Sequence, residues 1–123
     1  MSVKNGAPEF VHPVEAIFAQ MLNHYGINWQ YEPRTFVLAA DTAGEIIEAF
    51  TPDFYLPDEN LYVELTTLRP QLMTKKNRKM RLMEELYPET KVKLLRRRDL
   101  RDMLLQYGAD GEAARLLGTT AQS

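Results

Sequence analysis

The chain has 123 residues, is 45% hydrophobic and 26% charged, and carries a formal net charge of −2, which is typical of one compact domain. It has no cysteine, which excludes disulfide scaffolds, cysteine nucleophiles and thiolate zinc sites, and its two histidines argue against a histidine-built metal cage. The longest apolar run, residues 36–40, is far below the ~20 residues of a membrane span, and no secretory signal is visible, so a cytoplasmic protein without a membrane partner is expected.

The N-terminal part predicts a helix followed by strands. Residues 1–11 are expected to be a flexible lead-in. From Pro13, apolar residues recur at i, i+3, i+4 and i+7, which predicts an amphipathic helix ended by Gly26. Three short segments are then typical of strands: residues 27–31, 35–38 and 46–50.

A hairpin is predicted in the middle of the chain. Residues 51–57 contain two prolines, and the residue before each proline is pushed out of the helical region, so the segment is extended. Residues 58–60 form a turn, and residues 61–66 alternate as the clearest strand of the chain.

The C-terminal part returns to helical periodicity. Residues 70–87 predict a helix that Pro88 stops, residues 92–95 a strand, and residues 100–107 a short helix ended by Gly108. Together the elements predict an α/β fold with a mixed central sheet flanked by helices, in the order α-β-β-β-α-β-α.

The predicted organisation is a single domain at residues 12–108 followed by a short tail at residues 109–123. Within this tail, Ala113 to Leu117 is a candidate for a last helical turn, and the remainder is expected to fray.

Asp53 and Glu64 are the residue pair most suggestive of chemistry. Asp53 begins the extended segment and Glu64 lies in the following strand, so a hairpin would bring the two carboxylates side by side. Like charges repel, and Mg²⁺ or Mn²⁺ with oxygen ligands would relieve that repulsion. Such an ion can polarise a phosphodiester and activate water. The alternative is a pair of exposed strand carboxylates.

These segments resemble a known family. The stretch TPDFYLP at residues 51–57, followed by LYVELT at residues 61–66, resembles the core of the PD-(D/E)xK nuclease superfamily, in which an Asp after proline pairs with a Glu in the next strand. The following helix and strand are similar to those of the phage junction-resolving endonuclease and of transposase endonuclease subunits. The resemblance covers roughly residues 12–107 and implies a restriction-endonuclease-like core and a Mg²⁺-dependent DNA endonuclease.

The resemblance also implies a ligand set. The superfamily often places a metal-associated glutamate on its first helix, and Glu15 is the position that fits. Glu15, Asp53 and Glu64 would then hold one or two Mg²⁺ or Mn²⁺ ions, with the backbone carbonyl of Leu65 as a further ligand.

The sequence departs from the superfamily at Thr66, which stands where the motif has lysine. Threonine cannot supply the positive charge that steadies a developing phosphorane. Either the lysine has moved to the following helix or the site is inactive. Lys76 shares the apolar helix face and is the first candidate, and Lys79, at i+3, is the second. The alternative for such a lysine is that it snorkels to the edge of the core.

Charge is strongly segregated along the chain. Residues 1–68 hold two Lys/Arg against ten Asp/Glu, a net charge of −8, whereas residues 69–101 hold twelve against four, a net charge of +8. The basic segment predicts a phosphate-contacting surface, with a solvated helix face as the alternative. The predicted nucleic-acid-binding residues are Lys75, Arg78, Arg81, Arg96, Arg97 and Arg98.

The sequence therefore predicts a metal-dependent DNA endonuclease with limited sequence specificity, because backbone contacts position a protein rather than read sequence. RNA and branched DNA stay open as substrates. A homodimer, and a partner protein that supplies specificity, are further expectations. The alternative function is an inactive nucleic-acid-binding or structural module of the same fold.

Overall fold

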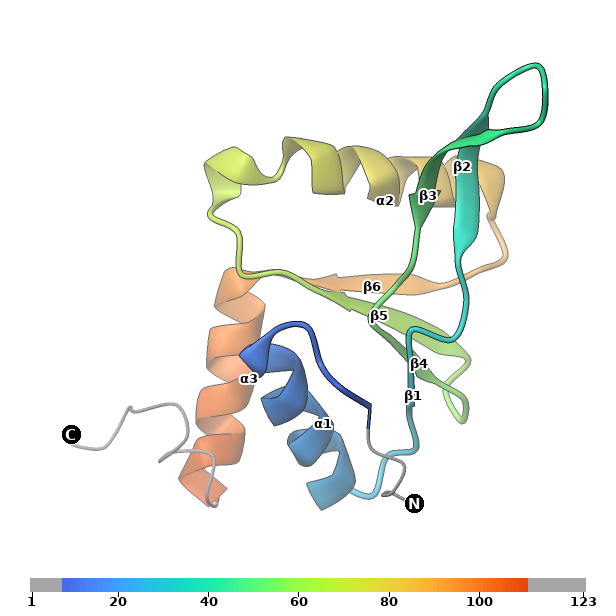
Figure 1. The fold of residues 1–123 in the computed structure, drawn as a ribbon. Helices are drawn as coiled ribbons and strands as arrows, with labels where there is room; N and C mark the ends of the chain where they lie inside the picture. The colour runs from blue at the N-terminus through green and yellow to red at the C-terminus, as the bar shows by residue number, and fades with distance from the viewer. Residues whose placement is uncertain (1–7, 111–123) are drawn as a thin grey trace.

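The computed structural model describes residues 8–110, which form a mixed sheet with helices on both faces (Figure 1). The α/β class is therefore as predicted. In chain order the elements are α1 (Pro13–His24), β1 (Gln30–Tyr31), β2 (Phe36–Ala40), β3 (Ile46–Phe50), β4 (Phe54–Leu56), β5 (Leu61–Leu65), the 3-10 turn η1 (Pro70–Leu72), α2 (Thr74–Leu86), β6 (Val92–Leu95) and α3 (Arg97–Asp110).

The main sheet has the strand order β1-β4-β5-β6. The predicted hairpin is confirmed, because β4 and β5 pair antiparallel with Phe54 opposite Val63 and Leu56 opposite Leu61. β6 runs parallel to β5, and a parallel neighbour needs a crossover connection. α2 supplies that crossover and lies over one face of the sheet (Figure 1).

The prediction of one central sheet in the order α-β-β-β-α-β-α is wrong in detail. β2 and β3 pair with each other and form a separate two-stranded sheet that projects beside α2 (Figure 1). β4 is an additional strand within residues 51–57, and the first predicted strand is reduced to Gln30–Tyr31. Alternation of apolar residues tells which face of a strand is buried but does not identify its partner.

The first core lies between the main sheet and the helices α1 and α3, which run side by side on the face opposite α2 (Figure 1). At its centre Phe54 is fully buried, and its ring packs against those of Phe18 and Trp29. Pro13 opens α1, and Gly26, just beyond its end, has a φ of +70°, which glycine adopts without strain. α1 therefore ends where the sequence predicts.

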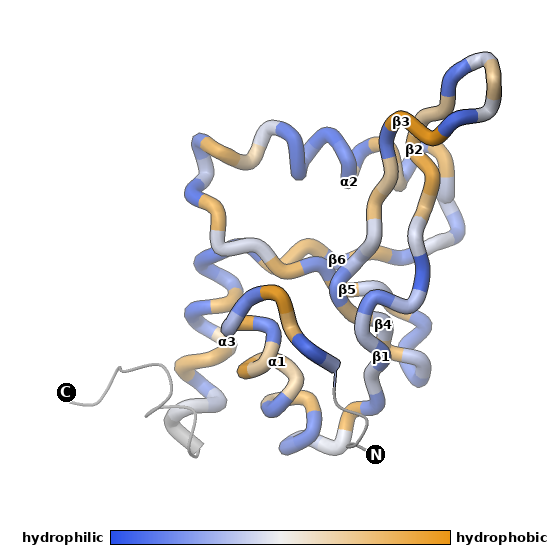
Figure 2. Tube along the Cα trace, viewed as in Figure 1, coloured by the Kyte–Doolittle hydropathy of each residue, from blue (hydrophilic) through white to orange (hydrophobic). Residues whose placement is uncertain are grey.

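The second core lies on the α2 face of the sheet. Phe36, Leu38 and Phe50 of the β2–β3 hairpin and Met83 of α2 are buried there, with Tyr62 of β5 packed against them. Figure 2 shows α2 as a mostly hydrophilic helix above apolar strands. Alternation along β5 thus points Val63 into the first core and its neighbours toward α2.

Two helix boundaries differ from prediction. Residues 70–87 are divided into η1 and α2, with Met73 between them. α3 runs through Gly108 to Asp110, so the predicted end at Gly108 is wrong. Tyr107 and Gly108 are both buried, and this packing offsets the ~1 kcal/mol that glycine costs within a helix.

The candidate helical turn at Ala113 to Leu117 lies outside the described residues. Among the helices of residues 8–110, none combines the length and apolar character that crossing a membrane requires.

Candidate active site

The β4–β5 hairpin joins Asp53 and Glu64 through reciprocal hydrogen bonds. The backbone N–H of Asp53 donates to Oε1 of Glu64 at 3.1 Å, and the backbone N–H of Leu65 donates to Oδ2 of Asp53 at 2.8 Å. Both carboxylates are buried, with 8% of Asp53 and 5% of Glu64 exposed. The side-by-side arrangement predicted from the sequence is thus present, and exposed strand carboxylates are not what the structure contains.

Burial makes this pair electrostatically unfavourable. Desolvation, followed by repulsion from Glu64, raises the pKa of Asp53 to about 8. Desolvation also raises the pKa of Glu64, although its hydrogen bond and attraction to Lys76 act in the opposite direction. Near neutral pH the pair therefore retains a proton on Asp53 unless a cation replaces it.

Glu15 in the first turn of α1 brings a third carboxylate to the same place. Only 3% of this residue is exposed, and after burial and Glu64 it is a further cause of the raised pKa of Asp53. Its Oε1 accepts from the Tyr31 hydroxyl at 2.7 Å and from the backbone N–H groups of Val11 at 3.1 Å and His12 at 3.4 Å. The three carboxylates predicted as ligands, from α1, from the residue before β4 and from β5, therefore lie close together.

Lying close together does not make the three carboxylates a preformed cage. Within residues 8–110, no group of three or more His, Asp or Glu side chains is arranged to hold a metal ion. Oε1 of Glu15 already accepts from three donors, whereas Asp53 and Glu64 form a buried pair whose charge is balanced by a proton and by the ammonium of Lys76. Mg²⁺ needs only one or two carboxylates beside its waters, so the pair Asp53 and Glu64 fits such an ion, while Glu15 is held by the Tyr31 hydroxyl.

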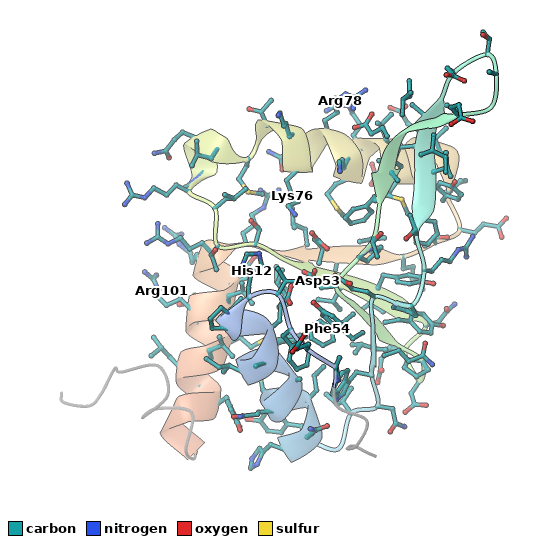
Figure 3. The ribbon with its side chains drawn as sticks, in the orientation of Figure 1. His12, Asp53, Phe54, Lys76, Arg78 and Arg101 are labelled. Atoms are coloured by element: carbon teal, nitrogen blue, oxygen red, sulfur yellow. The ribbon has the colours of Figure 1, made fainter. Side chains whose placement is uncertain are left out.

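Lys76 reaches the carboxylate pair from α2. Its Nζ lies 2.5 Å from Oε2 of Glu64, and 24% of its side chain is exposed. In Figure 3, Lys76 points from α2 toward the sheet, where Asp53 lies. Lys79 instead donates to the backbone carbonyl of Ala49 at 3.0 Å. The first candidate for the displaced lysine thus contacts the site, and the second is bonded to β3.

Thr66, at the position of the motif lysine, is buried and makes local structural contacts. It is 6% exposed, its hydroxyl accepts from the backbone N–H of Leu68 at 3.1 Å, and it lies 3.8 Å from the sulfur of Met73. Thr66 therefore fixes the start of the connection from β5 to α2 and brings no charge to the carboxylates.

Two clefts open on either side of Lys76. One, of about 230 Å³, is lined by Glu15, Leu65 and Thr66 among others. The other, of about 360 Å³, is lined by Glu64 together with Lys75 and Lys79. Leu65, a predicted metal ligand, thus borders the first cleft, and Glu64 borders the second.

The six predicted nucleic-acid-binding residues are exposed but are distributed over different parts of the surface. Lys75 and Arg78 line a cleft toward the β2–β3 hairpin, where Arg78 forms an ion pair with Glu48. Arg81 and Arg96 line a separate cleft of about 450 Å³ between α2 and β6.

Arg97 and Arg98 begin α3, and Figure 3 shows that Arg78 and Arg101 point to different sides of the molecule. The basic segment is therefore divided between surfaces and does not form one row.

Tyr31 is a site residue that the sequence analysis does not identify. It pairs with Phe54 across β1 and β4, and its hydroxyl holds Glu15. Burial and the hydrogen bond to Glu15 raise the pKa of the Tyr31 phenol. In the sequence, Tyr31 lies in a segment of alternating apolar residues. This pattern indicates an aromatic residue of the core but does not indicate a polar partner for its hydroxyl.

The resemblance to PD-(D/E)xK nucleases rests on the sequence segments at residues 51–57 and 61–66 alone. Comparisons of the chain with protein-family models, with curated proteins and with solved structures find no match.

Proposed function

We propose that this chain is a metal-dependent endonuclease with a restriction-endonuclease-like core that hydrolyses phosphodiester bonds in DNA. The observation that carries the proposal is the buried, hydrogen-bonded pair Asp53 and Glu64 with the ammonium of Lys76 on Glu64. Two carboxylates and a cation from a different element, in a cleft beside exposed lysines, are the groups that phosphodiester hydrolysis uses.

The carboxylates would hold a divalent cation. A Mg²⁺ or Mn²⁺ ion bound by Asp53 and Glu64, with the Leu65 carbonyl as a further ligand, would supply the positive charge that activates water and polarises the phosphate. Asp53 would release its proton when the ion binds, because the positive charge of the ion would offset the burial and the repulsion from Glu64 that raise its pKa.

Lys76 would take the role of the motif lysine. Its ammonium contacts Glu64 and lines both clefts, so it can stabilise negative charge that develops on the phosphate in the transition state. Glu64 orients this ammonium, and the second lysine, Lys79, holds β3 and helps to line the same cleft.

A second candidate function is an inactive nucleic-acid-binding module of the same fold. Thr66 is buried and fully used in the β5–α2 connection, and the residues 8–110 lack a preformed three-ligand metal group. In this case Lys76 only neutralises Glu64, and the basic residues bind phosphates without cleavage.

Cleavage of supercoiled plasmid and of linear, nicked and branched DNA in Mg²⁺ or Mn²⁺ tests the proposal. We expect activity in the wild type, and a loss of at least about 100-fold in Glu64→Gln and in Lys76→Met, because the first removes a ligand of the activating ion and the second removes the cation at the phosphate. Glu85→Gln and Lys93→Met, at exposed positions of α2 and β6, serve as matched controls and should retain activity.

DNA binding, measured for the same variants in EDTA, separates the two functions. The endonuclease predicts that Glu64→Gln binds DNA but does not cut it. The inactive module predicts binding without cleavage in every variant, including the wild type, and no heat of Mg²⁺ binding that depends on Asp53 or Glu64.

A further inference from the structure

Two exposed leucines stand at the mouth of the candidate active site. Leu68 is 40% exposed and Leu72 is 59% exposed, and both line the 360 Å³ cleft that contains Glu64 and Lys76. Single exposed apolar residues are ordinary on protein surfaces. Two exposed leucines in one cleft, beside a buried carboxylate pair, instead indicate a ligand with an apolar surface at that position.

Backbone hydrogen bonds fix the connection that carries these leucines. The backbone N–H of Leu68 donates to the Thr66 hydroxyl at 3.1 Å, and the N–H of Leu72 donates to the carbonyl of Arg69 at 2.8 Å in the turn η1. The next residue, Met73, is 2% exposed and anchors the connection in the protein. The leucines are therefore held outward by local hydrogen bonds at both ends of the segment.

The residues that line the cleft indicate the chemistry of a complementary ligand. Lys75, Lys76 and Lys79 line it together with the two leucines. The ligand that complements this mixture offers anionic groups and flat apolar surfaces at close spacing, and a nucleic acid does so with its phosphates and base faces. The volume of about 360 Å³ is at the small end of the roughly 300–1,000 Å³ typical of ligand sites, which suits one nucleotide better than an intact duplex.

We propose that Leu68 and Leu72 form an apolar wedge that enters between neighbouring bases of the bound nucleic acid, next to the phosphate at Glu64. Leucine is among the side chains that insert between base steps and unstack them. This inference rests on the proposed function for the identity of the substrate. It adds that DNA with a base already unstacked beside that phosphate, as at a mismatch, is bound in preference to fully paired DNA.

Base fluorescence tests the wedge without cleavage. Duplexes carrying 2-aminopurine, either fully paired or beside a single mismatch, are titrated with the full chain in EDTA. For the wild type we expect an increase in fluorescence on binding, and an affinity about tenfold higher for the mismatched duplex, because its base is cheaper to unstack. Leu68→Ala combined with Leu72→Ala should abolish the increase and bring the two affinities together.

Leu105→Ala is the matched control, since this leucine of α3 is 42% exposed and lines neither cleft. Thermal unfolding of each variant checks that the fold is retained, as exposed positions lead us to expect. Equal affinity of the wild type for paired and mismatched DNA, or an unchanged signal in the double variant, would overturn the wedge. So would an absence of DNA binding, which would mark the leucines as a protein-docking surface.

The outcome is distinguishable from that of the endonuclease proposal. Unstacking by a protein that never cuts DNA in Mg²⁺ or Mn²⁺ supports the wedge and contradicts the nuclease. Cleavage without unstacking supports the nuclease and contradicts the wedge alone.

Discussion

At the scale of single residues, Asp53 couples the candidate site to stability. Its pKa is about 8 in the folded protein, against an ordinary value of 3.8, so the folded state holds a proton that the unfolded state has lost across this range. The free energy of unfolding therefore falls as the pH rises from about 4 to about 8, by at most about 1.4 kcal/mol per pH unit for this group.

Asp53→Asn should flatten this dependence and raise the thermal midpoint at pH 8. The amide keeps an oxygen for the Leu65 N–H and cannot ionise. Midpoints measured by circular dichroism from pH 5 to pH 9 check the prediction, with the exposed Asp102→Asn as control. A wild-type midpoint that does not fall over this range relative to Asp53→Asn would contradict it.

Lys76 and Glu64 should be energetically coupled. Lys76→Met leaves Glu64 buried without its cation, which should lower the free energy of unfolding. We expect a loss of only about 1–2 kcal/mol, because the ammonium is partly exposed and therefore screened by solvent. Adding Glu64→Gln should recover most of that loss. Urea unfolding of the wild type, both single variants and the double variant measures the coupling, and strictly additive effects would show that the contact contributes nothing.

Sequence patterns identify some of these residues better than others. The position of Lys76 follows from helical periodicity, because a lysine on an apolar face must meet a partner or the edge of the core. The Asp53–Glu64 contact follows from a short turn between two strands. The bond from Tyr31 to Glu15 joins α1 to β1 across the fold, and no local pattern encodes it.

At the scale of elements, the β2–β3 hairpin is attached to α2 by few bonds. Lys79 donates to the Ala49 carbonyl, Tyr87 donates from its hydroxyl to the Val37 carbonyl at 2.8 Å, and Arg78 pairs with Glu48. Below them, Phe36 and Phe50 supply the apolar contact. This small interface holds the strand that leads directly into Asp53.

Lys79→Met combined with Tyr87→Phe should loosen this attachment while leaving the main sheet intact. We expect hydrogen exchange of the β2 and β3 amides to accelerate by about tenfold, in line with the loss of one or two hydrogen bonds. Amides of β5 should be unchanged, and Lys93→Met on β6 provides the control. Equal acceleration in both sheets would instead mean that the hairpin opens only with the whole domain.

This hairpin is also where prediction from sequence is incomplete. Phe36, Leu38 and Phe50 mark buried faces correctly, but their partner is Met83, more than thirty residues away in the chain. Pairing across such a distance depends on the course of α2, which alternation within a strand does not describe. The β4–β5 hairpin, by contrast, is local, and its register follows from its turn.

At the scale of the whole molecule, basic residues line clefts on two flanks of α2. The salt dependence of DNA affinity reports how many of them contact phosphates. Lys75 lines the cleft with Glu64, so Lys75→Ala should reduce the slope of log affinity against log salt by about 0.9. A single nucleic-acid surface requires the pair Arg81→Ala and Arg96→Ala to reduce the slope further. Fluorescence anisotropy between 50 and 200 mM salt provides the measurement, and an unchanged slope in the arginine pair would confine DNA to the Lys75 flank.

The pairing of β4 with β5 has a consequence for the order in which the site assembles. Closing a short hairpin costs little chain entropy, whereas the parallel β5–β6 pairing must wait for the long α2 crossover. During folding, Asp53 and Glu64 can therefore meet before α2 delivers Lys76. The nascent hairpin then carries two neighbouring negative charges with no ammonium beside them, and Asp53 takes up its proton only when later packing buries the pair away from water.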